Sequence, residues 1–173
     1  MKDFRSSKLG DGPIKLDPNQ INDLLSKTLI ANLATTDSDG GIHIVPMWFK
    51  KIDNAIYIPT SSKTHKYKNL LQRANASVMI DISLSGLNFI GVLIRGKVQI
   101  IRGDKAKELN RLIHLKYIRT EAFDNPNITN YLSTGDDVTI ELFIEKLISW
   151  NLADSKAGKS LREGGWAKPL DLE

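Results

Sequence analysis

Strand-like and helix-like spacings of apolar residues alternate along this chain of 173 residues. Segments rich in branched and aromatic residues, which favour strands, lie at residues 29–36, 42–50, 55–60, 76–82, 89–101, 138–144 and 146–152. Polar turns join neighbouring segments, and the run Asp37-Ser38-Asp39-Gly40-Gly41 is one of them. Strands in hairpin order predict a mainly antiparallel sheet that closes, or nearly closes, into a small barrel.

Helical spacing appears in three further segments, at residues 17–25, 65–74 and 104–118. Asp17 followed by Pro18 is a start signal for the first helix, and Asp104 is expected to cap the third. In the third helix, Leu112 is expected on the buried face, and His114 is interpreted as an ordinary helix residue. Helices beside a barrel predict the α+β class, mainly antiparallel β with flanking helices.

The length suits one domain, residues 1–173, with an N-terminal arm at 1–16 and a Gly- and Lys-rich tail at 153–173. No apolar run is long enough to span a bilayer and no signal peptide opens the chain, which favours a cytoplasmic protein without a membrane partner. The chain has no cysteine, which excludes disulfides and thiolate nucleophiles. Its net charge of +4 is spread out, so the signal for a nucleic-acid partner is weak.

Hydroxyl and amine side chains are concentrated where the strand at 55–60 gives way to the helix at 65–74. They are Thr60, Ser61, Ser62, Lys63, Thr64 and Lys66. Backbone N–H groups at a helix N-terminus favour an anion, so these residues suit a phosphate-bearing ligand. The alternative is that Ser62 or Thr64 is an ordinary N-cap beside solvated lysines.

The remaining polar residues provide little evidence for catalysis by a side chain or for a metal site. His43, His65 and His114 lie far apart without metal-ligand spacing, although His65 is placed to donate to a phosphate. Asp136 and Asp137 follow a glycine at a strand entry, where a turn explains them. No catalytic residue and no metal ligand is therefore assigned.

Pro46 interrupts the strand at 42–50, and a proline within a strand requires an edge, a bulge or a ligand alongside. The neighbouring Trp48 and Phe49 suit either a core or a dimer interface. The barrel interior is expected to be filled by side chains such as Leu33 and Ile58, which leaves a flat ligand only a groove on the surface.

Four segments in a fixed order carry a family resemblance: ANLATTDSDGGIHIVPMWFKK, AIYIPTSSKTHKYKNL, ASVMI and VLIRGKVQII. They resemble the pyridoxamine 5′-phosphate oxidase-like family of split β-barrels, which bind flavin mononucleotide (FMN) in a Greek-key barrel. The resemblance covers about residues 29–101. It implies a homodimer with two FMN sites at the subunit interface.

The resemblance also implies which residues contact the cofactor. The strand matching Val45, Pro46, Met47 and Trp48 runs along the ribityl and isoalloxazine groups. The phosphate is held by Thr60, Ser61, Thr64, His65 and Lys66, with Lys63 as a further contact. As large amphipathic side chains, Trp48, Phe49 and Trp150 are expected near the dimer interface, with a core position as the alternative for each.

Departures from the oxidase pattern bear on the activity. Gly91 stands where the oxidase has a glutamine, and Trp150 follows Ser149 where an arginine-histidine substrate motif would lie. The resemblance therefore implies an FMN-dependent oxidoreductase acting on an unidentified small organic substrate. Alternatives are a deazaflavin-coenzyme-dependent reductase on the same fold, a non-enzymatic flavin-binding protein, a haem-binding relative and an oligonucleotide-binding barrel.

Overall fold

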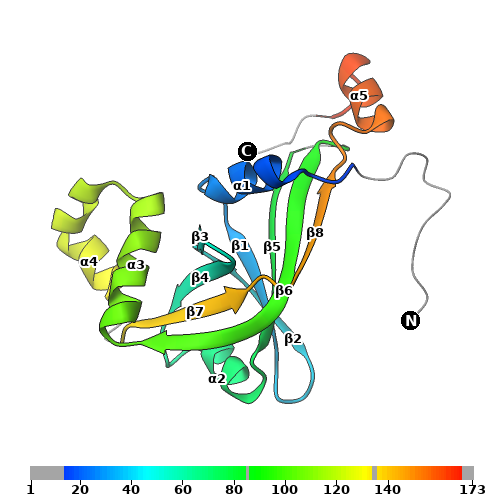
Figure 1. The fold of residues 1–173 in the computed structure, drawn as a ribbon. Coiled ribbons are helices and arrows are strands. Elements are labelled where there is room, and N and C mark those ends of the chain that lie inside the picture. Colours follow the sequence, from blue (N-terminus) through cyan, green and yellow to red (C-terminus); the bar gives the residue numbers. More distant parts are fainter. Residues whose placement is uncertain (1–13, 85, 134–135, 169–173) are drawn as a thin grey trace.

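The structure is a computed structural model and describes residues 14–84, 86–133 and 136–168. Its elements are α1 (Pro18–Ser26), β1 (Ala31–Thr36), β2 (Ile42–Met47), β3 (Lys50–Ile52), β4 (Ala55–Thr60), α2 (His65–Gln72), β5 (Asn75–Ser83), β6 (Phe89–Arg102), α3 (Asp104–Tyr117), a 3₁₀ helix (Thr120–Asp124), α4 (Pro126–Leu132), β7 (Val138–Phe143), β8 (Lys146–Asn151) and α5 (Lys156–Glu163). The strands form one antiparallel sheet in the order β2-β1-β5-β6-β7-β4-β3, with β8 also paired to β6 (Figure 1). The predicted α+β class is confirmed.

Strand β6 belongs to both halves of the curled sheet. Its first part pairs with β5 and β8, and its last part, from Val98 to Arg102, pairs with β7. The change of partner falls at Gly96, where an added Cβ atom would lie 1.9 Å from the carbonyl oxygen of Phe143. A glycine is therefore required for β6 to pass this close to the end of β7.

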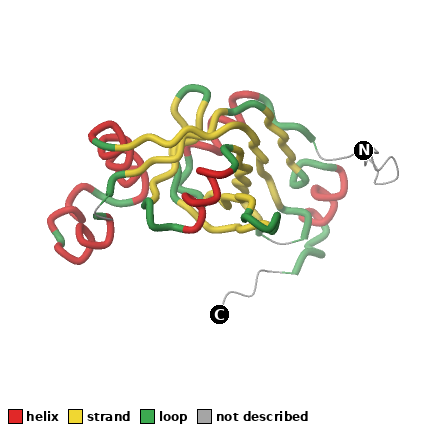
Figure 2. The backbone as a smooth tube through the Cα atoms, turned by 90° about the horizontal axis from the view of Figure 1, so that it is seen from below, coloured by secondary structure: helices red, strands yellow, loops and turns green. Residues whose placement is uncertain are grey.

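Alternating strands place their apolar residues in the interior, as the sequence predicted. Leu33, Ile58, Ile80 and Ile140 are fully buried and belong to one core cluster. Figures 1 and 2 show α3 and α4 together at one side of the strands, while α2 lies at the lower end of the sheet in Figure 1. No helix in the described ranges is long and apolar enough to cross a membrane.

The segment predicted as one strand at residues 42–50 is divided into β2 and β3. The break falls at Trp48 and Phe49, and Phe49 is fully buried in the core. Of the two positions expected for Phe49, the core and the dimer interface, the structure shows the core. The break arises because the chain turns Phe49 inward beside β4. Burial of the Phe49 side chain stabilises the fold more than continued pairing of an exposed edge strand would.

Three further details differ from expectation. Asp104 is the first residue of α3 rather than its cap, since Gly103 takes the cap position at φ 68° without a side-chain hydrogen bond. Leu112 is 40% exposed, whereas Ala106 and Ile113 are buried. The tail beyond residue 153 contains α5, and most of the predicted arm, residues 1–13, lies outside the described residues.

We expect Gly96→Ala to lower the free energy of unfolding by about 2–4 kcal/mol, because backbone atoms must shift to admit the methyl group. Gly41→Ala is the matched control: the nearest atom to its Cβ would be an oxygen of the flexible Asp39 carboxylate, at 3.1 Å, and the Asp37 side chain would lie at ordinary contact distance, so stability should change by less than about 1 kcal/mol. Denaturant titration of both variants measures the difference. Equal stability of the two would contradict the assigned role of Gly96.

Candidate functional site

A cavity of about 380 Å³ lies where the ends of β2 and β4 meet the start of α2, with α3 and α4 on its far side. It is lined by Pro46, Met47, Trp48, Pro59, Thr60, Ser61, Thr64, Lys66, Asn110, His114, Tyr131 and Leu132. Seven of the ten residues predicted to contact the cofactor line it: Pro46, Met47, Trp48, Thr60, Ser61, Thr64 and Lys66. The structure thus brings together the two segments that the resemblance assigns to one cofactor.

Val45, Lys63 and His65 do not line this cavity. Val45 packs against the hydrophobic core, Lys63 is exposed, and His65 lies against the turn between β1 and β2. A contact of any of the ten residues with a cofactor stays a prediction.

The loop before α2 is shaped by its own hydroxyl groups. The Thr64 hydroxyl donates to the carbonyl oxygen of Ser61 at 2.8 Å and accepts from the backbone N–H of Tyr67 at 3.4 Å, so Thr64 is the N-cap. Thr60 Oγ1 lies 3.1 Å from Thr64 Oγ1. Since the Thr64 proton is directed to Ser61, Thr60 acts as the donor of this pair. Both threonines are therefore engaged in holding the turn.

Ser61 has a different position in the loop. Its buried Oγ accepts from the backbone N–H of Lys63 at 3.2 Å, and within the described ranges its own proton has no hydrogen-bond acceptor. The backbone N–H of Ser62 donates to the carboxylate of Asp136 at 2.6 Å. The Ser61 hydroxyl, which lines the cavity, can thus still donate to a ligand.

Lys66 extends from the first turn of α2 into the cavity wall and is half-buried. Burial lowers the pKa of its ammonium group, and the described part of the chain gives this group neither an ion pair nor a hydrogen bond. Partial burial of a cation without a counter-ion is unfavourable. An anion bound beside Lys66 would relieve that penalty.

His65 contacts Asp37 instead of the cavity. Its Nε2 lies 3.0 Å from Asp37 Oδ1, and the Asn69 side-chain amide donates to the same oxygen at 2.6 Å. These hydrogen bonds, first that of Asn69 and then that of His65, lower the pKa of the Asp37 carboxyl group. Through His65 and Asn69, these contacts join the first part of α2 to the turn between β1 and β2.

Helix α3 supplies a wall that the sequence analysis missed. The indole of Trp48 stacks on Tyr117 with ring centroids 4.9 Å apart, and it meets the His114 ring in a T-shaped contact with centroids 5.9 Å apart. Burial lowers the pKa of His114, with Asp137 opposing this effect, so the imidazole is neutral at pH 7. The spacing of Asn110, His114 and Tyr117 at i, i+4 and i+7 is the signal that would have identified this face.

The Tyr117 hydroxyl group also fixes the break between β2 and β3. It accepts from the backbone N–H of Phe49 at 3.1 Å and donates to the carbonyl oxygen of Leu29 at 2.7 Å. Asn110 is held similarly, since its Oδ1 accepts from the hydroxyl of Thr139 at 2.7 Å. Both α3 side chains therefore fix the geometry of the cavity wall.

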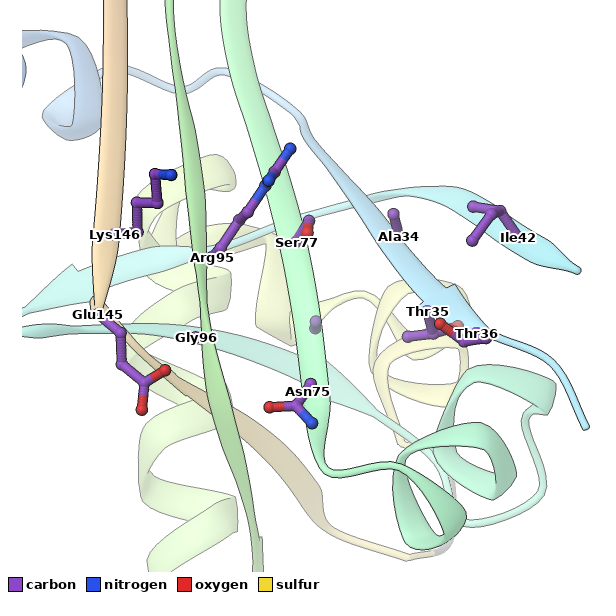
Figure 3. Close-up of a pocket in the computed structure, with 11 residues that line it drawn as sticks. Ala34, Thr35, Thr36, Ile42, Asn75, Ser77, Arg95, Gly96, Glu145 and Lys146 are labelled. Atoms are coloured by element: carbon purple, nitrogen blue, oxygen red, sulfur yellow. The ribbon is translucent and has the colours of Figure 1, made fainter. Parts of the chain in front are cut away.

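A second hollow, of about 330 Å³, lies on the outer face of the sheet near Gly96. Figure 3 shows its residues, with Arg95 and Lys146 on neighbouring strands and Ser77 and Ala34 on the strands beyond. Neither an aromatic side chain nor any residue predicted to contact the cofactor lines it. The cavity beside Lys66 is therefore the candidate site.

Comparison with known proteins identifies the family to which this geometry belongs. Residues 18–141 match the family model described as pyridoxamine 5′-phosphate oxidase. The chain belongs to this family. The match extends from α1 into β7 and so includes all of the strand and loop segments on the near side of the cavity.

Solved structures share the fold at low sequence identity. A conserved hypothetical protein from Mycobacterium tuberculosis superposes with a TM-score of 0.68 and 20% identity, covering 82% of this chain and 88% of that chain. An F420 reductase gives 0.59 and 20%, covering 76% and 98%, and the flavocytochrome Anf3 from Azotobacter vinelandii gives 0.63 and 16%, covering 91% and 79%. No curated protein sequence matches. The predicted split barrel of the oxidase family is confirmed.

We expect Tyr117→Phe to destabilise the protein by about 1–3 kcal/mol, because it leaves the N–H of Phe49 and the carbonyl of Leu29 without their partner. Tyr131→Phe removes the same atom from a side chain that is 80% exposed and should have little effect. Thermal unfolding of the two variants compares them directly. Similar melting temperatures would show that the Tyr117 hydroxyl does not fix the wall.

Proposed function

We propose that the protein is an FMN-dependent oxidoreductase acting on a small organic substrate. The observation that carries the proposal is the half-buried ammonium group of Lys66, which has no described counter-ion and lines a cavity beside a helix N-terminus. The Ser61 hydroxyl and the first N–H groups of α2 add uncharged donors. A phosphate group matches this combination of one cation and several hydrogen-bond donors.

The rest of the cavity suits the flat part of a flavin. Pro46, Met47 and Trp48 provide an apolar wall, and Tyr117 and His114 hold the indole of Trp48 in place. Such a surface supports a ring by dispersion and burial without supplying charge. A phosphate site at one end and an apolar wall at the other are what FMN requires.

FMN, when bound, supplies the chemistry of hydride and electron transfer. The chain's own residues contribute binding and orientation: Lys66 and Ser61 hold the phosphate end, and the Trp48 wall aligns the ring end. His114 stays neutral at pH 7 because it is half-buried, so it adds hydrogen-bonding capacity without charge. No side chain needs to act as a catalytic acid or base in this proposal.

Similarity in fold to an F420 reductase favours a second candidate, in which a deazaflavin coenzyme takes the place of FMN. Its longer phosphodiester tail would use Lys66 and extend toward the exposed Lys63. Binding titrations with FMN and with F420 distinguish the two candidates, because each coenzyme has its own absorption spectrum. Tighter binding of F420 by at least about tenfold, or about 1.4 kcal/mol, would favour the second candidate.

We infer further that two copies of the chain form a homodimer through the outer face of the sheet. Strand pairing places Met79, Leu93 and Ile148 in one row across β5, β6 and β8. Met79 and Ile148 are 39% and 41% exposed, and Ile44 on β2 is 61% exposed. An apolar face of this kind is typical of a surface that another protein covers.

The cavity adjoins this outer face. Pro46 is exposed on the same side of β2 as Ile44 and also lines the cavity. A second subunit packed over Ile44 would therefore stand beside the bound ligand and complete the site. A two-fold axis would make two equivalent sites.

We expect Lys66→Ala to weaken FMN binding by about 1.5–3 kcal/mol, or roughly tenfold to more than a hundredfold in Kd. Riboflavin, which lacks the phosphate, should bind both proteins almost equally. Fluorescence titration with the two ligands measures this difference. An equal effect on both ligands, or on neither, would contradict the phosphate assignment.

Lys63→Ala is the matched control for that experiment, because it removes the same group from an exposed side chain outside the cavity. It should weaken FMN binding by less than about threefold, since exposed charges contribute little. A loss as large as that of Lys66→Ala would move the phosphate site toward the loop surface.

Sedimentation at micromolar concentration should give twice the chain mass, with one flavin bound per chain. We expect Ile44→Glu to yield a monomer, because a carboxylate in an apolar interface lacks a partner. Leu71→Glu makes the same change at a residue that is 58% exposed on α2 and should leave the dimer intact. A wild-type monomer with full flavin occupancy would refute the placement of the site at an interface.

A further inference from the structure

A groove of about 300 Å³ lies between α1, β3 and the last turn of α3. It is lined by Asn22, Leu25, Ser26, Lys50, Lys51 and Lys116 and shares no residue with the candidate cavity. Half of these residues are lysines, and none is acidic. Within the described ranges the three lysines have no ion pair, so the groove is electropositive.

Lys116 has a distinct environment in this groove. Its half-buried Nζ donates to the carbonyl oxygen of Leu25 at 3.0 Å and lies 3.6 Å from the centre of the Phe49 ring. Burial, together with the nearby charge of Lys50, lowers the pKa of this amine to about 8. Lys116 lines the groove and also a second hollow beside Arg119 and Glu121, so it borders open space at the surface.

The lowered pKa of Lys116 and the positive charge of the groove together favour reaction with an anionic electrophile. At pH 7.5 about a quarter of an amine with a pKa of about 8 is neutral, compared with about one part in a thousand for an ordinary lysine. Only the neutral amine has the lone pair needed for nucleophilic attack. Lys50 and Lys51 meanwhile provide two charges that attract a phosphate dianion.

We propose that Lys116 is a covalent modification site for acyl phosphates, which the groove recognises through Lys50 and Lys51. The neutral Nζ attacks the carbonyl carbon of the acyl phosphate and forms a carbon–nitrogen bond. The bond between that carbon and the phosphate oxygen breaks, and inorganic phosphate leaves with the electron pair. The nitrogen releases a proton to water, so the products are an amide on Lys116 and free phosphate.

Acylation would change the local contacts in a defined way. The amide carries no positive charge, so the interaction with the Phe49 ring is lost, while one N–H remains to donate to Leu25. The proposal does not depend on FMN binding, since the groove and the cavity have no lining residue in common.

The test is to incubate the purified full chain with acetyl phosphate at pH 7.5 and to follow each lysine by peptide mass spectrometry. Lys116 should be acetylated at least about tenfold faster than Lys159, an exposed lysine on α5, because of its larger neutral fraction. Its rate should level off above about pH 8, where the amine becomes mostly neutral. Equal rates at pH 7.5 would overturn the proposal.

Two variants and a second reagent test recognition by the groove separately from reactivity. Lys51→Ala should slow acetylation of Lys116 by acetyl phosphate at least about threefold, while Lys146→Ala, an exposed lysine outside the groove, should not. Excess inorganic phosphate should also slow the reaction at Lys116. Acetic anhydride, which is uncharged, should modify Lys116 equally in wild type and in Lys51→Ala. If Lys51→Ala left the acetyl phosphate rate unchanged, the groove would not recognise the phosphate.

Discussion

At Gly96, strand β6 passes so close to the carbonyl oxygen of Phe143 that no side chain fits between them, and this crossing determines how the two halves of the sheet meet. Beyond it, β6 pairs with β7, and β7 in turn pairs with β4. The pairing places Thr60 opposite Val138 at the end of β4, where the loop that lines the cavity begins. A glycine distant from the cavity therefore helps to fix the position of the cavity.

Helix α3 connects the other parts of the site. It follows β6 and precedes β7, and it returns over the break between β2 and β3. There Tyr117 bonds to the backbone of Phe49 and stacks on Trp48, while Asn110 bonds to Thr139 on β7. Helix α3 thus contacts the segment that follows edge strand β2, the buried Phe49 and strand β7. These contacts fix the position of Trp48 in the cavity wall.

Features encoded by short-range signals could be predicted from the sequence. Asp17 and Pro18 start α1 as expected, with a complete capping box, and Thr64 caps α2 as one of the two proposed residues. The cavity wall formed by β2 and by the loop after β4 was predictable for the same reason, because the sequences of both segments resemble those of the family. Local hydrogen bonds and side-chain types determine these elements.

Features that depend on long-range contacts could not be predicted in this way. The break at Phe49 depends on burial against strands that follow it, and the role of His114 depends on a helix that begins more than 40 residues after β4. The orientation of His65 depends on Asp37 in a separate turn. Helix α5 is short and contains Gly158, whose close approach to the carbonyl of Leu152 appears only in three dimensions.

The internal hydrogen bonds of the loop between Thr60 and Thr64 have a consequence for binding kinetics. The loop already holds its turn through the Thr60, Ser61 and Thr64 hydroxyls, and Asp136 holds the N–H of Ser62. A ligand that arrives there meets a preorganised surface and need not order the backbone, so little conformational entropy is lost on binding. Association at this end should then be governed by diffusion and charge, and differences in affinity between ligands should arise mainly in their dissociation rates.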